Sequence, residues 1–441
     1  MTATIKDFVD RTYKNQHFYF DGTSGLDAND GLALATPKKT LQAIFDIIPE
    51  AIYHYIYIHA TGVCDSAAIS PEFTKRITPD AMVLIDGGDT HTVVAGPFTA
   101  TGAAINSITV AAAGWGVDGY AGYIIEILDG VADDNYRTVS KNTVDTIYPS
   151  IDFSAIPAGA QFRIVRPTTE FKANAYTVLY LASYDIGPIQ FSRIYFSQGL
   201  TIYPQILTNL LMSGCVLNNG NASVGCIGNN GSTAVTLWAK NFWWTGYPTQ
   251  YKVGVGIVTT NPILMQRGIF GCYNSYFKNV TLKNVQQTVS RISATRINGL
   301  LDMRDFLFMG DDSGYVFIEQ GTGFPTTIEN ASGVGLRAYN CEFTIKGGVS
   351  VSNCAGHGIE AIRSFIKFTG VVAGSGNTGA GVYAHLGSII TPKIGSPPTI
   401  TGTVGNLAVE DPAVQQESWA NVNAGTVVSI AGEGTVVKAV A

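Results

Sequence analysis

Charge is scarce in this chain of 441 residues: only 14% of them are Asp, Glu, Lys or Arg, and the formal net charge is −6. No cluster of Lys and Arg stands out, and phosphate binding needs a basic surface. We therefore expect no nucleic-acid partner. Few long polar helices can form either, because such helices carry charged residues on their exposed side.

Long apolar runs are missing as well. No apolar stretch reaches the length of about 18 residues that a membrane-spanning helix needs. The start of the chain lacks the charged and then apolar pattern of a secretion signal. We therefore expect no membrane insertion, and a protein that is made and assembled in a cytosol.

The chain has six cysteines, and none forms a Cys-x-x-Cys pair or a metal-ligand spacing with the six histidines. We expect free, buried thiols, no metal and no cofactor. Asp27, Asn29 and Asp30 surround a turn as the ligands of a calcium loop do, but no glutamate closes the loop at its twelfth position. Turn stabilisation or helix capping is the preferred interpretation of these three residues.

Glycine and short apolar runs are plentiful, with 49 glycines in the chain. Three copies of one pattern recur at an identical interval, starting at Ser332, Ala355 and Thr378. Each copy has a Gly-x-Gly corner and then alternating apolar and outward residues, the period of two of a strand with one buried face. Such a repeat cannot bury its apolar face alone, so the copies must stack at the strand spacing of roughly 4.8 Å.

Stacking predicts columns of equivalent side chains. Leu336, Ile359 and Val382 form an inward ladder, while Arg337 and Glu360 share the next, outward position. An ion pair between Arg337 and Glu360 is preferred over a catalytic role for Glu360. His357 and His385 are expected as separate corner or surface residues, with no Asp or Ser at the spacing of a catalytic triad.

An acidic, Gly-rich turn lies near the N-terminus at residues 21–31, before Thr36-Pro37 and a helical pattern with Leu41 and Ile44 on its apolar side. This turn, with the sequence Thr-Pro-x-x-Thr-Leu-x-Ala-Ile after it, resembles the start of right-handed parallel β-helix proteins of the pectate-lyase-like superfamily, in particular those of bacteriophage tailspikes and related virion proteins. The resemblance also covers the repeat region. It implies an all-β, right-handed single-stranded parallel β-helix and a homotrimer, but no particular chemistry, because the superfamily includes lyases, hydrolases and inert structural proteins.

Changes of pattern along the chain predict five segments. Residues 95–170 read as antiparallel strands joined by turns, and they also resemble a β module of phage tail proteins. The five segments are an N-terminal docking arm with a short helix at 1–17, the start of the β-helix with a capping helix at 18–94, an inserted antiparallel β domain at 95–170, the parallel β-helix at 171–411, and a C-terminal β clasp at 412–441.

Two functions follow from the pattern and the resemblance. The first is a structural virion surface protein of a tailed bacteriophage, a trimeric spike, fibre or capsid decoration that contacts host glycans or braces the particle. Its partners would be its own copies, other virion proteins at the N-terminal arm, and host surface polysaccharide. The alternative is a tailspike depolymerase that cleaves bacterial surface polysaccharide as a glycoside hydrolase or lyase. A bacterial surface adhesin is disfavoured by the missing secretion signal.

Whether the chain is an enzyme stays open from sequence. Hydrolysis of a glycosidic bond needs two carboxylates about 5 to 9.5 Å apart. Asp302, Asp305 and Glu319 are the catalytic candidates if it is one, and the alternative for this acidic stretch is a solvated corner beside core aromatics. A dense aromatic cluster is the candidate for glycan or subunit contact, with subunit contact preferred; it includes Trp238, Trp243, Trp244 and Tyr247.

Overall fold

A computed structural model of the chain shows a mostly β protein whose described part contains one helix, α2 (Leu41–Ile47). It divides into two compact units, Met1–Asn261 and Pro262–Ala441. In some strands the description covers the backbone alone. The described residues are 15–65, 72–78, 80–129, 136–150, 152–157, 159–172, 177–181, 188–197, 200–204, 209–217, 235–237, 241–244, 256–257, 263–273, 275–277, 280–285, 291–293, 295–306, 317–319, 325–385, 388–391, 399–403, 405–410 and 427–429.

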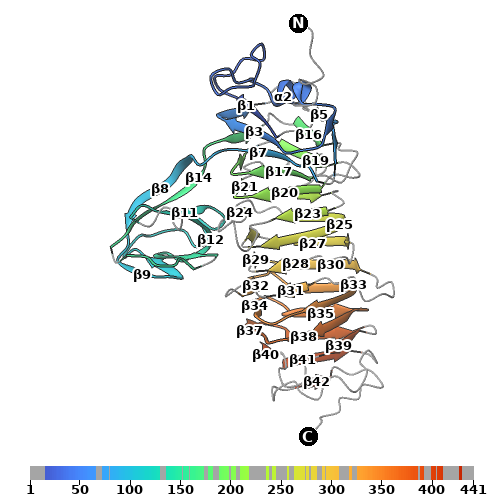
Figure 1. The fold of residues 1–441 in the computed structure, drawn as a ribbon. Coiled ribbons are helices and arrows are strands. Elements are labelled where there is room, and N and C mark those ends of the chain that lie inside the picture. The colour runs from blue at the N-terminus through green and yellow to red at the C-terminus, as the bar shows by residue number, and fades with distance from the viewer. Residues whose placement is uncertain are drawn as a thin grey trace. The chain divides into compact units, whose positions relative to one another are not determined.

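The second unit is built from parallel strands in three ladders, to which each repeat contributes in turn (Figure 1). The first ladder holds β27 (Val280–Val285), β30 (Leu301–Phe306), β35 (Ile359–Ile362), β38 (Ala380–His385), β41 (Gly405–Glu410) and β42 (Val427–Ser429). The second holds β28 (Arg291–Ser293), β31 (Phe317–Glu319), β36 (Phe365–Phe368) and β39 (Ile389–Thr391). The third holds β26 (Tyr276–Phe277), β29 (Arg296–Asn298), β32 (Thr326–Glu329), β34 (Val349–Ser352), β37 (Val372–Asn377) and β40 (Thr399–Gly402). The long strands β25 (Ile263–Tyr273) and β33 (Leu336–Ile345) contribute to both the first and the second ladder.

Equivalent residues of neighbouring repeats lie side by side in these ladders. Leu336 pairs with Ile359, and Ile359 pairs with Val382. All three side chains are buried, as are Ala338, Ala361 and Ala384 two residues further along. The alternation that the sequence shows thus places one apolar residue of each repeat above its counterpart, and the columns form a continuous dry core.

Glycine is required where the backbones of successive repeats meet at the corner before the first ladder. A Cβ atom on Gly358 would lie 2.6 Å from the carbonyl oxygen of Gly381, and one on Gly335 would lie 2.7 Å from Sγ of Cys354. Any side chain at either position would force the two layers apart. The Gly-x-Gly part of the repeat therefore reflects close contact between layers.

The corner between the first and second ladders uses left-handed backbone instead. Asp305, Asn340 and Arg363 have φ values of 59°, 51° and 49° at successive levels of the unit. Asparagine and aspartate tolerate this conformation better than most residues, and a single left-handed residue turns the chain sharply. This turn ends the first ladder and sends the chain into the second.

The first unit also contains stacked parallel strands. One ladder comprises β1 (Gln16–Asp21), β3 (Ile56–Thr61), β7 (Val83–Asp86), β17 (Pro188–Ser192), β20 (Asn209–Ser213) and β23 (Asn241–Trp244), with β22 (Val235–Leu237) in the same sheet. A second comprises β4 (Val63–Asp65), β15 (Glu170–Lys172), β18 (Tyr195–Phe196), β21 (Val216–Leu217) and β24 (Gly256–Ile257). Shorter parallel groups are β5 (Glu72–Phe73) with β16 (Thr177–Leu181) and β19 (Leu200–Pro204), and β2 (Ala51–Ile52) with β6 (Arg76–Ile77).

Helix α2 begins after its cap residue Thr40, which is held by Asp27 of the acidic turn. The side chain of Thr40 accepts a hydrogen bond from the backbone N–H of Ala43, and Oδ1 of Asp27 accepts one from the N–H of Thr40 itself. Leu41, Ile44 and Phe45 are the buried face of the helix. Asp27 therefore fixes the start of the helix.

A seven-stranded antiparallel sheet lies between β7 and β17 in sequence, although β7 and β17 are themselves paired neighbours. The sheet has its own core around Trp115, Ile125, Phe162 and Ile164. In sheet order its strands are β8 (His91–Thr99), β14 (Gln161–Pro167), β11 (Ile124–Ile127), β12 (Tyr136–Asn142), β13 (Thr146–Pro149), β10 (Ser107–Thr109) and β9 (Gly102–Ala104). The chain thus leaves the parallel strands after β7 and returns to them at β15, which pairs with β4 and β18, before β17 pairs with β7.

Contacts within the first unit hold this antiparallel sheet against the parallel strands. Ile124 and Val165 from the sheet form a small core with Tyr195 and Val216 of the stack. The guanidinium group of Arg166 lies 3.9 Å from the centre of the Tyr195 ring, within the range of a cation–π contact.

The predicted end segments lie largely outside the described residues. Nothing before residue 15 is described, and Gln16 and His17, which we placed in the N-terminal arm, belong to β1. In the predicted C-terminal clasp, the described part is β42, which pairs in parallel with β41 as a further level of the same ladder. The bounds proposed for the five segments stay a prediction.

The inward columns make a test of the stacking possible. Ile359→Ala should lower the free energy of unfolding by about 2 to 5 kcal/mol, because it opens a cavity in the column between Leu336 and Val382. Lys367→Ala, at an exposed position of β36, should change it by no more than about 0.5 kcal/mol. Denaturant unfolding of both variants is the measurement, and similar losses in the two would contradict the inward assignment.

Candidate functional site

The outer face of the first ladder in the second unit carries two columns of polar and aromatic residues. Pairing between β30, β33, β35 and β38 aligns Asp302, Arg337, Glu360 and Tyr383. The same pairing aligns a second column two residues further along the strands, made of Arg304, Tyr339, Ile362 and His385. Because alternate residues of a strand point to the same face, both columns lie opposite the buried Leu336 and Ala338 columns.

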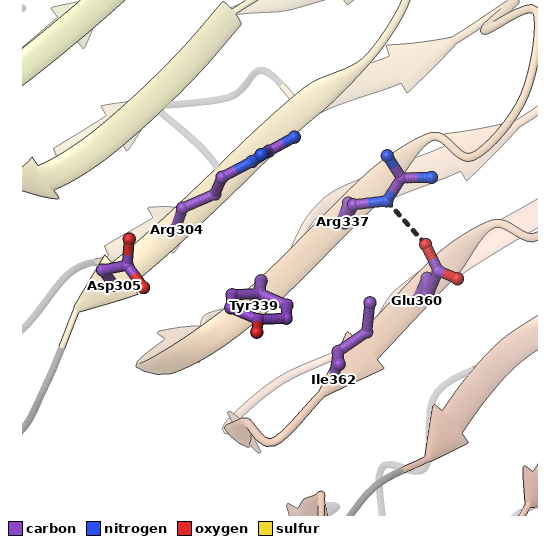
Figure 2. Close-up of a pocket in the computed structure, with 6 residues that line it drawn as sticks. All are labelled: Arg304, Asp305, Arg337, Tyr339, Glu360 and Ile362. Carbon is purple, nitrogen blue, oxygen red and sulfur yellow. Dashed lines mark hydrogen bonds and ion pairs between the residues drawn. The ribbon is translucent and has the colours of Figure 1, made fainter.

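A groove with a volume of about 480 Å³ lies over these two columns (Figure 2). Tyr339 lies beside Arg304 in the second column, and Ile362 lies beyond Tyr339 in the same column. Its lining residues are Arg304, Asp305, Arg337, Tyr339, Glu360 and Ile362. We call this surface the arginine groove.

Each arginine of the groove forms an ion pair with a carboxylate. Arg337 Nε on β33 donates to Oε2 of Glu360 on the neighbouring strand β35 at 2.6 Å (Figure 2). Arg304 donates to Oδ2 of Asp302 from Nη2 at 2.6 Å and from Nε at 3.0 Å. The hydrogen bond to Asp302 raises the pKa of the Arg304 guanidinium, which is therefore charged at any pH of interest.

Beside the groove, three rings form a continuous stack. The ring of Tyr383 lies between those of His357 and His385, with centroid separations of 4.4 and 4.7 Å. His385 Nε2 lies 3.7 Å from Oε1 of Glu360, and this nitrogen is buried without a hydrogen-bond partner among the described residues. We expected His357 and His385 to be separate corner or surface residues. His357 does lie at a corner, but the two are not separate, because the ring of Tyr383 lies between theirs and His385 lies beside the Arg337–Glu360 pair.

His357 is held by a hydrogen bond as well as by stacking. Its Nδ1 accepts a hydrogen bond from the backbone N–H of Ala380 at 2.9 Å, which requires an unprotonated Nδ1. Burial lowers the pKa of His357, and the neighbouring His385 lowers it further, while Glu360 acts in the opposite direction. The imidazole is thus neutral in the folded protein at neutral pH.

The predicted catalytic acids belong to two ladders, with Asp302 and Asp305 in β30 and Glu319 in β31. The carboxylate of Asp302 is buried and bound to Arg304, while its Oδ1 has no hydrogen-bond partner within the described ranges. Asp305 is a groove residue and accepts a hydrogen bond from Asn340 at 3.3 Å. Glu319 belongs to the second ladder, and its side chain lies outside the described residues.

Register places these acids on opposite sides of a corner. Asp302 pairs with Arg337, whereas Phe317 and Ile318, just before Glu319, pair with Thr344 and Ile345 beyond the turn at Asn340. Asp302 therefore belongs to the first ladder and Glu319 to the second.

The aromatic cluster proposed for glycan or subunit contact falls mainly outside the described residues. Trp238 and Tyr247 are not described, and of Trp243 and Trp244 only the backbone in β23 is. Their role stays a prediction.

The sequence did not reveal Tyr339 and Ile362 as site residues. The signal was present, since both follow the outward positions of Arg337 and Glu360 by two residues, and alternate residues share a face. The outward position two residues further along each strand therefore identifies them.

Metal ligands and reactive thiols do not gather in the part of the chain that the structure describes. No group of three or more His, Cys, Asp or Glu side chains in the described ranges is arranged to hold a metal ion. The helix within the described residues, α2, is too short to span a bilayer. Cys64, Cys215, Cys341 and Cys354 are buried, and burial raises the pKa of Cys215 to about 12.

Comparisons with known proteins found weak structural likenesses. No family model matches the chain, and no curated protein matches its sequence. The structure of XylC with xylose has a TM-score of 0.21 and 10% identity, covering 89% of this chain and 74% of that one. The Gp54 tailspike of Acinetobacter baumannii bacteriophage AP22, in complex with A. baumannii capsular saccharide, has a TM-score of 0.18 and 9% identity, with 86% and 74% covered. The GH136 lacto-N-biosidase from Eubacterium ramulus has a TM-score of 0.20 and 10% identity, with 85% and 58% covered.

The neutral state of His357 predicts a dependence of stability on pH. Because the folded pKa is lowered, the unfolded chain binds more protons as the pH falls through the ordinary histidine pKa of about 6.5, and the free energy of unfolding decreases there. His357→Gln removes this contribution, so its free energy of unfolding should fall less than that of the unaltered protein between about pH 7.5 and pH 5. Denaturant unfolding at the two pH values measures both losses, and equal losses would contradict the assignment.

Proposed function

We propose that the chain is a virion surface protein of a tailed bacteriophage that contacts host glycans through the arginine groove. In this proposal it is a right-handed single-stranded parallel β-helix that forms a homotrimeric spike, fibre or capsid decoration, with its N-terminal arm on other virion proteins. Its location would be the virion, after assembly in the host cytoplasm. The N-terminal motif and the repeat, which resemble phage virion β-helices, support this proposal.

The β-helix proposal draws on the ladders of each unit. Successive strands of a repeat enter three different ladders, and the next repeat enters the same three again in the same order. Connections between parallel strands of one sheet are right-handed in the great majority of proteins, which favours a right-handed coil.

The arginine groove is the observation that carries the glycan proposal. A saccharide presents hydroxyl oxygens, which accept hydrogen bonds from guanidinium groups, and C–H faces, which pack on aromatic rings. Arg304 and Arg337 supply the donors, and Tyr339 and Ile362 supply a less polar surface beside them. The strands that form the groove repeat at a constant spacing, so the surface is suited to an extended chain of similar units.

The geometry of the groove favours contact over cleavage. Its two carboxylates, Asp305 and Glu360, lie two strands and three residues apart, so their backbone positions are separated by about 14 Å. Glu360 points to Arg337, and Asp305 lies at the other end of the groove (Figure 2). A hydrolase pair requires about 5 to 9.5 Å between its carboxyl groups. The alternative, a depolymerase, is therefore tested by whether the protein shortens the polysaccharide that it binds.

The proposal predicts that Tyr339→Ala weakens retention of the protein on immobilised host surface polysaccharide by about 10-fold, since a sugar-facing aromatic ring and its buried area contribute roughly 1 to 2 kcal/mol. Tyr57→Ala is the matched control, because Tyr57 is a partly exposed tyrosine of β3 in the other unit, stacked on His17. Retention on purified capsule and lipopolysaccharide of host strains is measured for each protein.

Equal retention of both variants would contradict the assignment of the groove, and no retention of the unaltered protein would contradict glycan contact altogether. The length of the polysaccharide after incubation is measured in the same samples. A shortened chain would favour the depolymerase, and Asp305→Asn and Glu319→Gln would then identify which of the candidate acids the cleavage needs.

A further inference from the structure

We propose that the arginine groove selects acidic saccharides, whose sugar units carry carboxylate groups, over neutral ones. This inference depends on the proposed function, because it specifies the chemical class of the glycan that the groove contacts. The supporting observation is that the two ion pairs place their positive charges at the surface and their negative charges further inside the second unit.

In both ion pairs the arginine is at the surface and the carboxylate is beneath it. The side chain of Arg304 is 47% exposed and that of its partner Asp302 is 5% exposed. Arg337 is 35% exposed and Glu360 is 14% exposed. A ligand that approaches either pair therefore meets the guanidinium group before its carboxylate partner. The formal charges of each pair cancel, and Asp305 adds a further carboxylate at the other end of the groove from Glu360.

The arginines also retain hydrogen-bond donors that the ion pairs do not use. A guanidinium group has five N–H donors in a planar fork. Arg337 uses Nε for Glu360, and neither of its Nη groups hydrogen-bonds to another described residue. Arg304 uses Nε and Nη2 for Asp302, and its Nη1 group donates to no other described residue.

A carboxylate is the group that fits these remaining donors best. Two parallel N–H groups bind the two oxygens of a carboxylate at once, and such charge-assisted bonds are about twice as strong as neutral ones. A sugar hydroxyl accepts from one donor at a time and carries no charge. Arg337 can therefore distinguish a uronic acid from the corresponding neutral sugar.

The carboxylates beneath the arginines position them for this contact. Asp302 and Glu360 each fix one side of a guanidinium group, which lowers the conformational entropy that binding would otherwise cost. Arg304 and Arg337 lie on neighbouring strands with an offset of two residues, a diagonal separation of about 7 to 8 Å. Figure 2 shows both guanidinium groups extending in the same direction along the strands, so one acidic unit, or two adjacent ones, is within their reach.

The experiment uses a panel of uronate-containing bacterial capsular polysaccharides, each next to its carboxyl-reduced neutral derivative. The full chain should bind the acidic forms at least about 10-fold more tightly, and the difference should shrink as salt is raised. Arg337→Gln should lower affinity for the acidic forms by about 10-fold and leave the neutral forms within about 2-fold. Lys367→Gln, which removes one exposed positive charge on β36 outside the groove, should leave both unchanged.

Arg337→Gln leaves Glu360 without its partner, so the double variant Arg337→Gln with Glu360→Gln is measured too, and unchanged denaturant unfolding establishes that it is folded. It should lose the preference for acidic forms to the same extent. Equal binding of acidic and neutral forms by the unaltered protein would overturn the inference and leave glycan contact intact. An equal loss in Lys367→Gln would also overturn it, because the preference would then reflect net charge alone. If no polysaccharide of either kind is bound, the proposed function itself fails.

Discussion

Register between stacked parallel strands is the constraint on which the second unit depends. Each strand must place its apolar residue directly against the equivalent residue of the next repeat, since a shift of one residue would turn every inward side chain outward. The pairs Leu336–Ile359 and Ile359–Val382 meet this requirement, and the glycine corners let the layers approach to the hydrogen-bonding distance. The same register fixes the outer face, because the residue next to each inward position is then also aligned with its counterpart.

The groove follows from this alignment. Asp302, Arg337 and Glu360 are far apart in sequence but lie next to one another at the strand spacing. Arg337 in one layer therefore forms its ion pair with Glu360 in the next layer. No loop is needed to build the surface. The strands place each charged group, and the side-chain ion pairs with Asp302 and Glu360 orient the two guanidinium groups.

Part of this arrangement could be predicted from the sequence, because period and alternation are local signals. The inward positions of Leu336, Ile359 and Val382 and the shared outward position of Arg337 and Glu360 follow from the constant interval between the repeats. The aromatic stack of His357, Tyr383 and His385 could not be predicted in this way. It joins a corner residue of one repeat to strand residues of the next, and the direction of a corner side chain is set by the turn and not by the period. Glu319 shows a similar limit, since only pairing beyond the Asn340 corner places it in a different ladder from Asp302.

Formation of a disulfide between engineered cysteines tests the register most directly. Thr327 and Ser350 are paired residues on β32 and β34. Their Cα atoms are therefore about one strand spacing apart, which is within the separation that a disulfide can bridge. We expect the variant with cysteines at 327 and 350 to form the bond on mild oxidation, while cysteines at 327 and 352, a diagonal pair, do not. The reverse result, or equal bond formation in both, would contradict the stacking on which the core and the arginine groove depend.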